Sequence, residues 1–303
     1  MAPARVDVRR ARPLLGTFVD ISASGATHEV TARAVDAAFA AIADVHRLMS
    51  FHDNGSDVGR LNREATLHPV TVDASTLAVL QTALDLHRRS GGAFDIAVAP
   101  VLQDLGLLPR DRSVALARSE VATSAAIELL TDNRVAFRTP GMAIDLGGVA
   151  KGFAVDRALN VLKGAGVTAA IVNAGGDLAT FGPLAQSIGI RDPRDPARII
   201  CSVALRDRAL ASSGRSVDPV RSSDRAAIAV IDPQSQEPTA GIIGATVVAP
   251  TCMIADAITK VVMIMGAHAS PLLDHFSADA MMVEASGDIC MTANWNDLVS
   301  RAA

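Results

Sequence analysis

Two glycine pairs in the segment DLGGVAKGFAVDRALNVLKGAGVTAAIVNAGGDLATFG (residues 145–182) most constrain what this chain can fold into. Gly147-Gly148 stands directly before a helical pattern, and Gly175-Gly176 interrupts a strand pattern. Glycines leave backbone N–H groups bare, and at a helix N-terminus such groups bind anions such as phosphate. The segment therefore predicts close approach of a ligand to the backbone. A tight strand-to-helix turn is the alternative.

Charged residues surround both glycine pairs. Lys151, one turn into the helix, adds a cation, while Asp145 and Asp177 flank the exposed backbone. The carboxylates could hold a ribityl or ribose hydroxyl, a flavin ring N–H or a metal, although an Asp at a strand end also caps turns. The pattern is neither G-x-G-x-x-G nor G-K-[ST], which argues against a Rossmann or P-loop assignment.

The stretch ADAITK places Asp256, Thr259 and Lys260 on one face of a predicted helix. A carboxylate and a hydroxyl so arranged can hold Mg²⁺ against a pyrophosphate. An Asp256–Lys260 ion pair on a solvated face is the alternative, and spacing alone favours it. The histidines and cysteines show no spacing typical of a zinc site.

Hydrophobic periodicity predicts helices that alternate with antiparallel strands, which indicates an α+β fold. No linker-like composition shift divides the chain, so a single domain over residues 1–303 is expected, with a mobile loop at 215–226. The predicted helices cover 29–50, 74–90, 147–166 and 251–268, and the predicted strands cover 14–24, 126–132, 134–141, 168–182, 226–233, 244–250 and a hairpin at 280–292.

Charge and cysteine usage limit the partners and the compartment. The net charge is −4, with acids and bases mixed along the chain, which argues against a nucleic-acid partner. Three cysteines in apolar runs suit buried thiols in a reducing compartment, so a cytoplasmic location is expected. No signal-type apolar run and no run of eighteen apolar residues is present, so we expect neither export nor a membrane span.

Several motifs in order resemble the ApbE family, the FAD:protein FMN transferases, over about residues 12–292. The most specific are D-L-G-G-x-A-K-G-x-A-V-D followed by V-N-x-G-G-D. Further matching segments are LLGTFVDIS, MSFHDNGSDVGRLNRE, GGAFDIAVAPV, IGIRDPRDP, VIDPQSQEP and ATVVAPTCMIADAITKVVMIMG.

The resemblance implies duplicated T-fold-like halves with FAD bound between them. It also implies Mg²⁺-dependent transfer of FMN from FAD to a Thr hydroxyl of a target protein, with release of AMP; some members instead hydrolyse FAD to FMN and AMP. Catalytic roles are expected for Asp256, Asp232 and Lys260. Metal ligands are expected among Gly148, Ala150, Asp256 and Thr259. FAD contacts are expected at His52, Ala93, Phe94, Asp95, Asp145, Gly147, Lys151, Gly175, Gly176 and Asp177.

The chain departs from the family pattern on its catalytic side. The family reads H-I-I-D-P where this chain has Ala229, and loss of a general base typically slows a reaction about 10²- to 10⁴-fold. Transfer is then slow or absent unless Asp232 takes over. The metal helix of the family reads A-D-x-x-x-T, but that Thr position is Lys260. Either Thr259 still reaches the ion, or the Lys260 ammonium stands where Mg²⁺ would and partly replaces its charge.

Two further substitutions lie near the expected flavin site: His52 replaces a flavin-stacking Tyr, and Arg215 reverses the charge of a family acid. The departures leave two alternatives to a transferase: a degenerate FAD- or flavin-binding protein, and an FAD pyrophosphatase.

Overall fold

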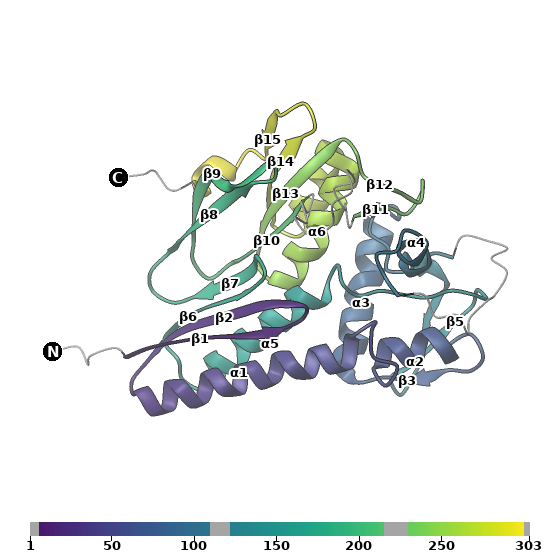
Figure 1. The fold of residues 1–303 in the computed structure, drawn as a ribbon, viewed down its shortest axis with the longest axis horizontal. Coiled ribbons are helices and arrows are strands. Elements are labelled where there is room, and N and C mark those ends of the chain that lie inside the picture. Colours follow the sequence, from purple (N-terminus) through teal and green to yellow (C-terminus); the bar gives the residue numbers. More distant parts are fainter. Residues whose placement is uncertain (1–5, 110–121, 215–229, 300–303) are drawn as a thin grey trace. The chain divides into compact units, whose positions relative to one another are not determined.

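The structure, a computed structural model, describes residues 6–109, 122–214 and 230–299 (Figure 1). The chain forms two compact units. Unit 1 consists of Met1–His46, Lys151–Arg215 and Gly241–Ala303, and unit 2 of Arg47–Ala150 and Ser216–Ala240. The single domain expected from the sequence stays a prediction, and the two units are described separately below.

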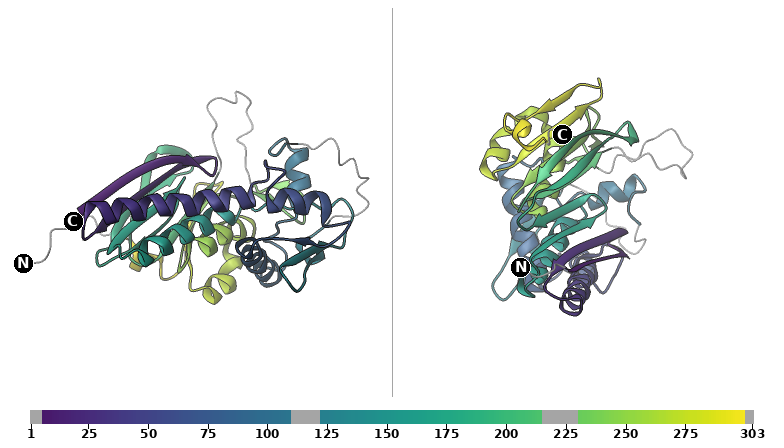
Figure 2. Two further views of the ribbon diagram at one scale, coloured as in Figure 1. Left: turned by 90° about the horizontal axis from the view of Figure 1, so that it is seen from below. Right: turned by 90° about the vertical axis from the view of Figure 1, so that its left-hand side faces the viewer.

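Unit 1 is built on an eight-stranded sheet in the order β1-β2-β6-β7-β10-β13-β14-β15, and its neighbouring strands pair antiparallel (Figures 1 and 2). The strands are β1 (Val6–Leu14), β2 (Thr17–Gly25), β6 (Ala169–Ala174), β7 (Asp177–Phe181), β10 (Ala209–Gly214), β13 (Ile242–Ala249), β14 (Asp279–Glu284) and β15 (Ile289–Met291). A separate hairpin joins β8 (Gln186–Asp192) to β9 (Asp195–Leu205).

The second glycine pair forms the turn between β6 and β7. Gly175 and Gly176 have φ of 65° and 104°, values that favour glycine and that two-residue hairpin turns require. The turn is braced by the Gly176 N–H, which donates to Asn173 Oδ1 at 2.9 Å. Hairpin geometry therefore favours glycine at both positions, and at Gly175 a Cβ would also lie 2.6 Å from Thr17 Oγ1.

Helices cover the sheet of unit 1. In α1 (His28–Met49), apolar residues that recur at helical spacing are buried, including Val35, Phe39 and Ile42. Arg12 of β1 lies over the Phe39 ring, 4.5 Å from its centroid. The remaining elements are α5 (Ala150–Gly164), α6 (Cys252–Met265), η2 (Gly266–Ala269), α7 (Ser270–His275) and α8 (Trp295–Leu298).

Helix α6 packs against β10 and β13. By length and composition alone, the segment Cys252–His275 could cross a membrane, but more than half of its most apolar stretch is buried in the structure. Its backbone also turns at Gly266, where φ is 57°. Burial against the sheet accounts for the apolar composition of this segment.

Unit 2 is smaller and has short strands. Helix α3 begins after Asp73, whose Oδ1 accepts from the Ser75 N–H at 2.7 Å, and carries basic residues in its last turn. The elements are α2 (Asp57–Glu64), β3 (Val70–Thr71), α3 (Ala74–Arg89), α4 (Ala99–Asp104), η1 (Ser124–Ala126), β4 (Ile127–Leu129), β5 (Arg134–Phe137), β11 (Ile231–Asp232) and β12 (Glu237–Pro238).

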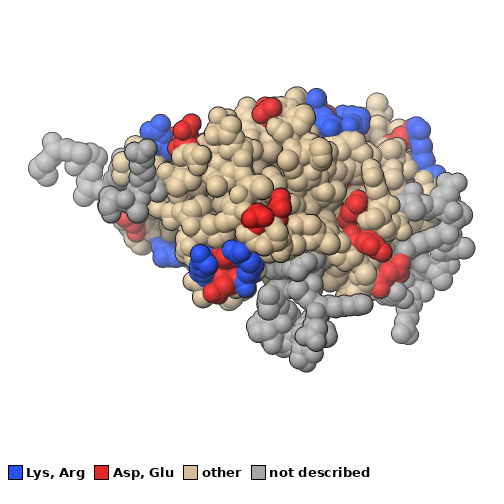
Figure 3. All heavy atoms as spheres, turned by 90° about the horizontal axis from the view of Figure 1, so that it is seen from above, with Lys and Arg blue, Asp and Glu red and all other residues tan. Residues whose placement is uncertain are grey.

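The α+β class predicted from the sequence is confirmed, as are the long helices and the hairpin at 280–292. The sequence analysis did not predict β1, α2 or the β8–β9 hairpin. The loop expected at 215–226 lies outside the described residues. On the face that Figure 3 draws, charged side chains stand in small groups divided by uncharged surface, and several groups hold both acidic and basic side chains.

A candidate active site of lysines and buried aspartates

The first glycine pair leads into α5 through a compact turn. Asp145 Oδ2 accepts from the Gly147 N–H at 3.0 Å, and the Ala150 N–H donates to the Leu146 carbonyl at 2.8 Å. These bonds bend the chain so that Lys151 stands in the first turn of α5. The helix that the sequence predicts directly after a glycine-rich turn is therefore confirmed.

Lys151 belongs to a cluster that we call the Lys–Asp cluster: Lys151, Asp177, Asp256 and Lys260. Lys151 forms an ion pair with Asp177, and its Nζ lies 3.9 Å from Asp256 Oδ1. Lys260 forms an ion pair with Asp256 Oδ1 and also donates to the Asp256 carbonyl at 2.9 Å. The cluster thus joins α5, β7 and α6 within unit 1.

Because the two aspartates of the cluster are buried, the charge of each member depends on its neighbours. The Asp177 and Asp256 side chains are 2% and 0% exposed, whereas those of Lys151 and Lys260 are 34% and 19% exposed. Burial by itself would raise the pKa of Asp256, but Lys260 and Lys151 outweigh it and hold that pKa low. Burial opposes the charge of Lys151, yet Asp256 and Asp177 raise the pKa of its ammonium. Asp256 is therefore an ionised anchor between two cations.

Asp177 differs from Asp256. Burial, followed by the nearby negative charge of Asp256, raises the pKa of Asp177. The two acids share the Lys151 ammonium, and Asp256 alone has Lys260 as well.

Helix α6 presents its three predicted residues on one face. Thr259 Oγ1 donates to the Asp256 carbonyl at 2.7 Å and lies 2.7 Å from Ser213 Oγ of β10. The Asp256–Lys260 ion pair favoured by the sequence spacing is present, but the solvated face expected with it is wrong, because Asp256 is fully buried.

The close approach of α5 to α6 explains Gly152. A Cβ at this position would lie 2.3 Å from the Cys252 carbonyl oxygen, and the Gly152 N–H donates to Asp256 Oδ2 at 3.1 Å. One turn later, the Asp156 carboxylate accepts from the Cys252 and Met253 N–H groups, each at 2.8 Å. Burial raises the pKa of Asp156 to about 6. Both residues belong to the motif quoted above, but the sequence analysis assigned them no role, since their partners lie far away in the chain.

Unit 2 also carries residues that were expected to contact FAD, and these residues differ in burial and in hydrogen bonding. Asp95 accepts from the Ser124 Oγ at 2.5 Å and from the Ala97 N–H at 2.7 Å, and lies 3.2 Å from His87 Nδ1. Hydrogen bonding to Asp95 raises the pKa of His87. Asp95 thus binds neighbouring elements together in this structure. Ala93 and Phe94 are buried, and His52 is exposed.

Asp232, expected to replace the missing family base, belongs to β11 in unit 2. Its Oδ1 accepts from the Gln234 N–H at 2.9 Å. Ala229 and Arg215 lie outside the described residues.

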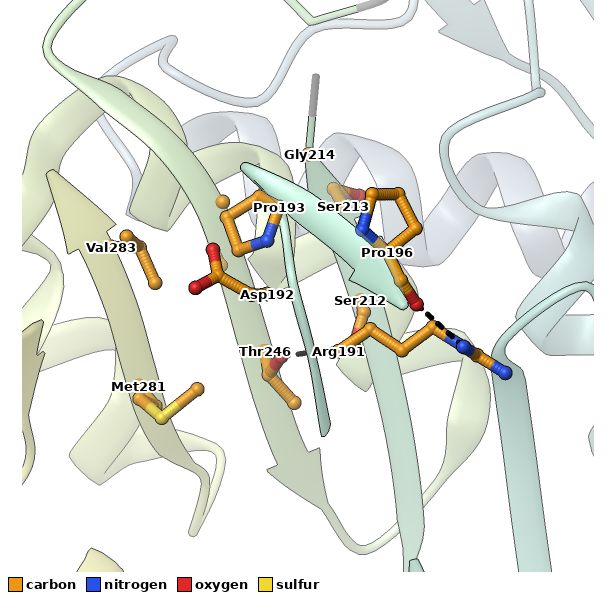
Figure 4. A pocket seen from close by; sticks show the side chains of 12 residues that line it. Arg191, Asp192, Pro193, Pro196, Ser212, Ser213, Gly214, Thr246, Met281 and Val283 are labelled. Carbon is orange, nitrogen blue, oxygen red and sulfur yellow. Dashed lines mark hydrogen bonds between the residues drawn. The ribbon is translucent and has the colours of Figure 1, made fainter. Parts of the chain in front are cut away.

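A pocket of about 220 Å³ lies beside the β8–β9 hairpin in unit 1 (Figure 4). Arg191 reaches along the hairpin to the Pro196 carbonyl at 2.6 Å. Ser213 of β10 also lines the pocket, and its Oγ lies 2.7 Å from Thr259 Oγ1 of α6. Its other lining side chains include Asp192, Ser212, Thr246, Met281 and Val283. No local sequence pattern predicts this pocket, because its walls come from separate strands.

The residues at Asp256 do not fit a divalent metal ion as they stand. One carboxylate oxygen of Asp256 is taken by the Lys260 ammonium and the other accepts from Gly152. The Thr259 hydroxyl is engaged by the helix carbonyl and by Ser213. Among the described residues, no group of three or more His, Cys, Asp or Glu side chains could hold a metal. Mg²⁺ would have to displace an ammonium from the only acid among the expected ligands.

An antiparallel sheet with two lysines and two aspartates, brought together by α5, β7 and α6, defines an α+β protein with a charged and largely buried site. The sequence matches the ApbE family over residues 15–283. The chain belongs to the ApbE family.

Curated relatives carry the name FAD:protein FMN transferase. One from Treponema pallidum (strain Nichols) is 28% identical, over 92% of this chain and 85% of the relative. Another, from Vibrio cholerae serotype O1, is 28% identical over 74% of this chain and 70% of the relative.

Solved structures agree on the fold. The ApbE protein of Thermotoga maritima superposes with a TM-score of 0.83 at 25% identity, covering 98% of this chain and 100% of that chain. The flavin transferase ApbE of Vibrio cholerae gives a TM-score of 0.79 at 21% identity, covering 97% and 100%.

Proposed function

We propose that this protein is an enzyme that transfers FMN from FAD to a Thr hydroxyl of a target protein and releases AMP. Membership of the ApbE family and the curated relatives support the activity. The observation that carries it to this chain is the Lys–Asp cluster, to which the two most specific family motifs contribute Lys151 and Asp177. The acceptor Thr is inferred from the resemblance alone.

The reaction forms a bond between the Thr oxygen and the FMN phosphorus. It breaks the bond from that phosphorus to the bridging oxygen, so that AMP leaves with the bridging oxygen. Such phosphoryl transfers depend on positioning and on stabilising negative charge. Lys151 and Lys260 supply positive charge at the buried cluster, and Asp256 and Asp177 hold both ammonium groups in place.

The Thr hydroxyl must lose its proton during attack. Where the family places a His, this chain has Ala229. We propose Asp232 of β11 as the proton acceptor, because it is the acid nearest in sequence to the lost His. Mg²⁺ was expected from the resemblance; since the donors at Asp256 do not fit it, no step is assigned to it. A cytoplasmic location is also proposed, supported by three unpaired cysteines.

The direct test is incubation of the protein with FAD and a Thr-bearing flavinylation target, with and without Mg²⁺. The target is then weighed by intact-mass spectrometry, and the nucleotides of the same sample are separated on a column. We expect a target heavier by one FMN and an equal amount of AMP. A known family member treated in parallel shows that the target is competent.

Other outcomes identify the alternatives. AMP and free FMN with an unmodified target would indicate an FAD pyrophosphatase. Intact FAD that remains bound would indicate a degenerate flavin-binding protein, the alternative that Ala229 favours. Ala229→His separates slow transfer from none, because it should raise transfer only where the rest of the site is competent.

A further inference from the structure

The place where the family carries a metal ligand holds a lysine in this chain, and that lysine is paired with the acid that would bind the metal. We propose that the Lys260 ammonium is the fixed cation of the FAD-processing site, in place of a divalent metal ion, so that FAD binding needs no Mg²⁺. This inference rests on the proposed function.

The geometry holds the ammonium while leaving it accessible. Within the described residues, Lys260 Nζ donates to two oxygens, the carbonyl and the carboxylate of Asp256. An ammonium has three N–H donors, so one remains for a ligand oxygen. The Lys260 side chain keeps 19% of its surface exposed, whereas Asp256 has none. The acid serves as an anchor, and the cation stays within reach of a ligand.

The choice of lysine agrees with this role. The chain has 28 lysines and arginines, and only three of them, Lys151, Lys163 and Lys260, are lysines. Two of the three belong to the Lys–Asp cluster. An ammonium is a compact point charge, whereas a guanidinium is a planar fork, so lysine is the side chain closer in shape to a metal ion.

The balance of charge within the Lys–Asp cluster also argues against a divalent metal ion. Lys151 and Lys260 match Asp177 and Asp256 one to one. A divalent ion at Asp256 would add two positive charges next to an ammonium already there, at a side chain with no exposed surface. Displacing Lys260 would also separate a buried ion pair, which is costly.

The first experiment uses the wild-type protein. FAD affinity is measured by calorimetry in EDTA and in Mg²⁺, and Mn²⁺ binding is measured by electron paramagnetic resonance with and without FAD. We expect FAD dissociation constants within about twofold of each other in the two buffers. We expect no stoichiometric Mn²⁺ site.

The second experiment restores the family spacing with Lys260→Thr. This variant should lose ~10-fold or more of its FAD affinity in EDTA, recover it in Mg²⁺, and bind one Mn²⁺ in the presence of FAD. Lys163→Thr is the matched control, since Lys163 lies on α5 outside the cluster, over the Phe181 ring at 5.2 Å. It should behave as the wild type does.

Two results would overturn the inference without touching the transferase proposal. One is wild-type FAD binding that disappears in EDTA together with a stoichiometric Mn²⁺ site. The other is a Lys260→Thr variant that binds FAD in EDTA as the wild type does. Should that variant fail to fold, the wild-type comparison still decides. Absence of FAD binding in both buffers would contradict the proposed function itself.

Discussion

Asp256 carries the most buried charge of the candidate site. Its carboxylate has no exposed surface and is held by Lys260, by Lys151 and by the Gly152 N–H. An acid in this position stabilises the fold only while its cations are present, because an unpaired buried charge is costly.

Asp256→Asn removes this charge and leaves the Lys260 ammonium without its anion. Breaking a buried ion pair costs about 3–5 kcal/mol, so we expect a loss of unfolding free energy of that order. Urea unfolding followed by circular dichroism measures it. Asp36→Asn is the control, since Asp36 pairs with Arg10 and Arg12 at an exposed site and should leave stability near that of the wild type. Equal effects of the two changes would contradict the buried role of Asp256.

The sequence could predict only part of this residue-level picture. Asp256 and Lys260 are four positions apart on a helix, so their contact follows from helix geometry. Lys151, Asp177 and Asp256 meet only because α5, β7 and α6 pack together, and no local pattern encodes that. The engagement of Asp95 by Ser124 is likewise tertiary.

At the scale of elements, α5 and α6 touch at Gly152. Gly152→Ala would place a Cβ 2.3 Å from the Cys252 carbonyl oxygen, and backbone atoms cannot yield as a flexible side chain can. Overpacking of this kind costs about 1–3 kcal/mol, and we expect the upper end or more. Gly164→Ala, in the same helix, meets nothing within 4 Å and should be neutral or slightly stabilising. Thermal unfolding of both variants tests the contact, and equal Tm values would contradict it.

The Asp156 carboxylate accepts from the first two N–H groups of α6, and its titration should make the stability of the protein depend on pH. The pKa of Asp156 is raised from 3.8 to about 6 in the folded protein. Between about pH 4 and 6 the folded protein therefore binds a proton that the unfolded chain has released, and this group's contribution to stability falls as pH rises. Asp156→Asn should reduce that fall by roughly 2–3 kcal/mol, measured as unfolding free energy across this range. Parallel pH profiles for wild type and variant would contradict the assignment.

The sequence predicts the elements whose apolar residues recur at a regular spacing. It does not predict those in which charged residues or prolines interrupt the apolar pattern. Helices α1 and α3 follow from apolar residues that recur on one face. Strand β1 was missed because three of its residues are arginines, two of which pair with Asp36 of α1. In the β8–β9 hairpin, Asp and Pro residues obscure the strand pattern.

At the scale of the whole molecule, FAD binding should stabilise the folded protein against unfolding. A ligand at about 100 times its dissociation constant adds about 2.7 kcal/mol to the unfolding free energy, which raises Tm by several degrees. Calorimetry gives the overall shift, and the fluorescence of the single Trp295, fully buried in unit 1, reports on that unit. A shift that FMN or AMP alone reproduces in full would contradict recognition of the intact dinucleotide.

The scarcity of lysine gives the protein an unusual chemical reactivity. Acylating reagents need an accessible amine, and the Lys151 and Lys260 amines are engaged in ion pairs and partly covered, whereas Lys163 is exposed. Among the lysines, Lys163 should therefore acylate first and serve as an internal reference for the other two. The yield at Lys151 and Lys260 relative to Lys163, read from a peptide digest, becomes a footprint of whether the ion pairs are intact.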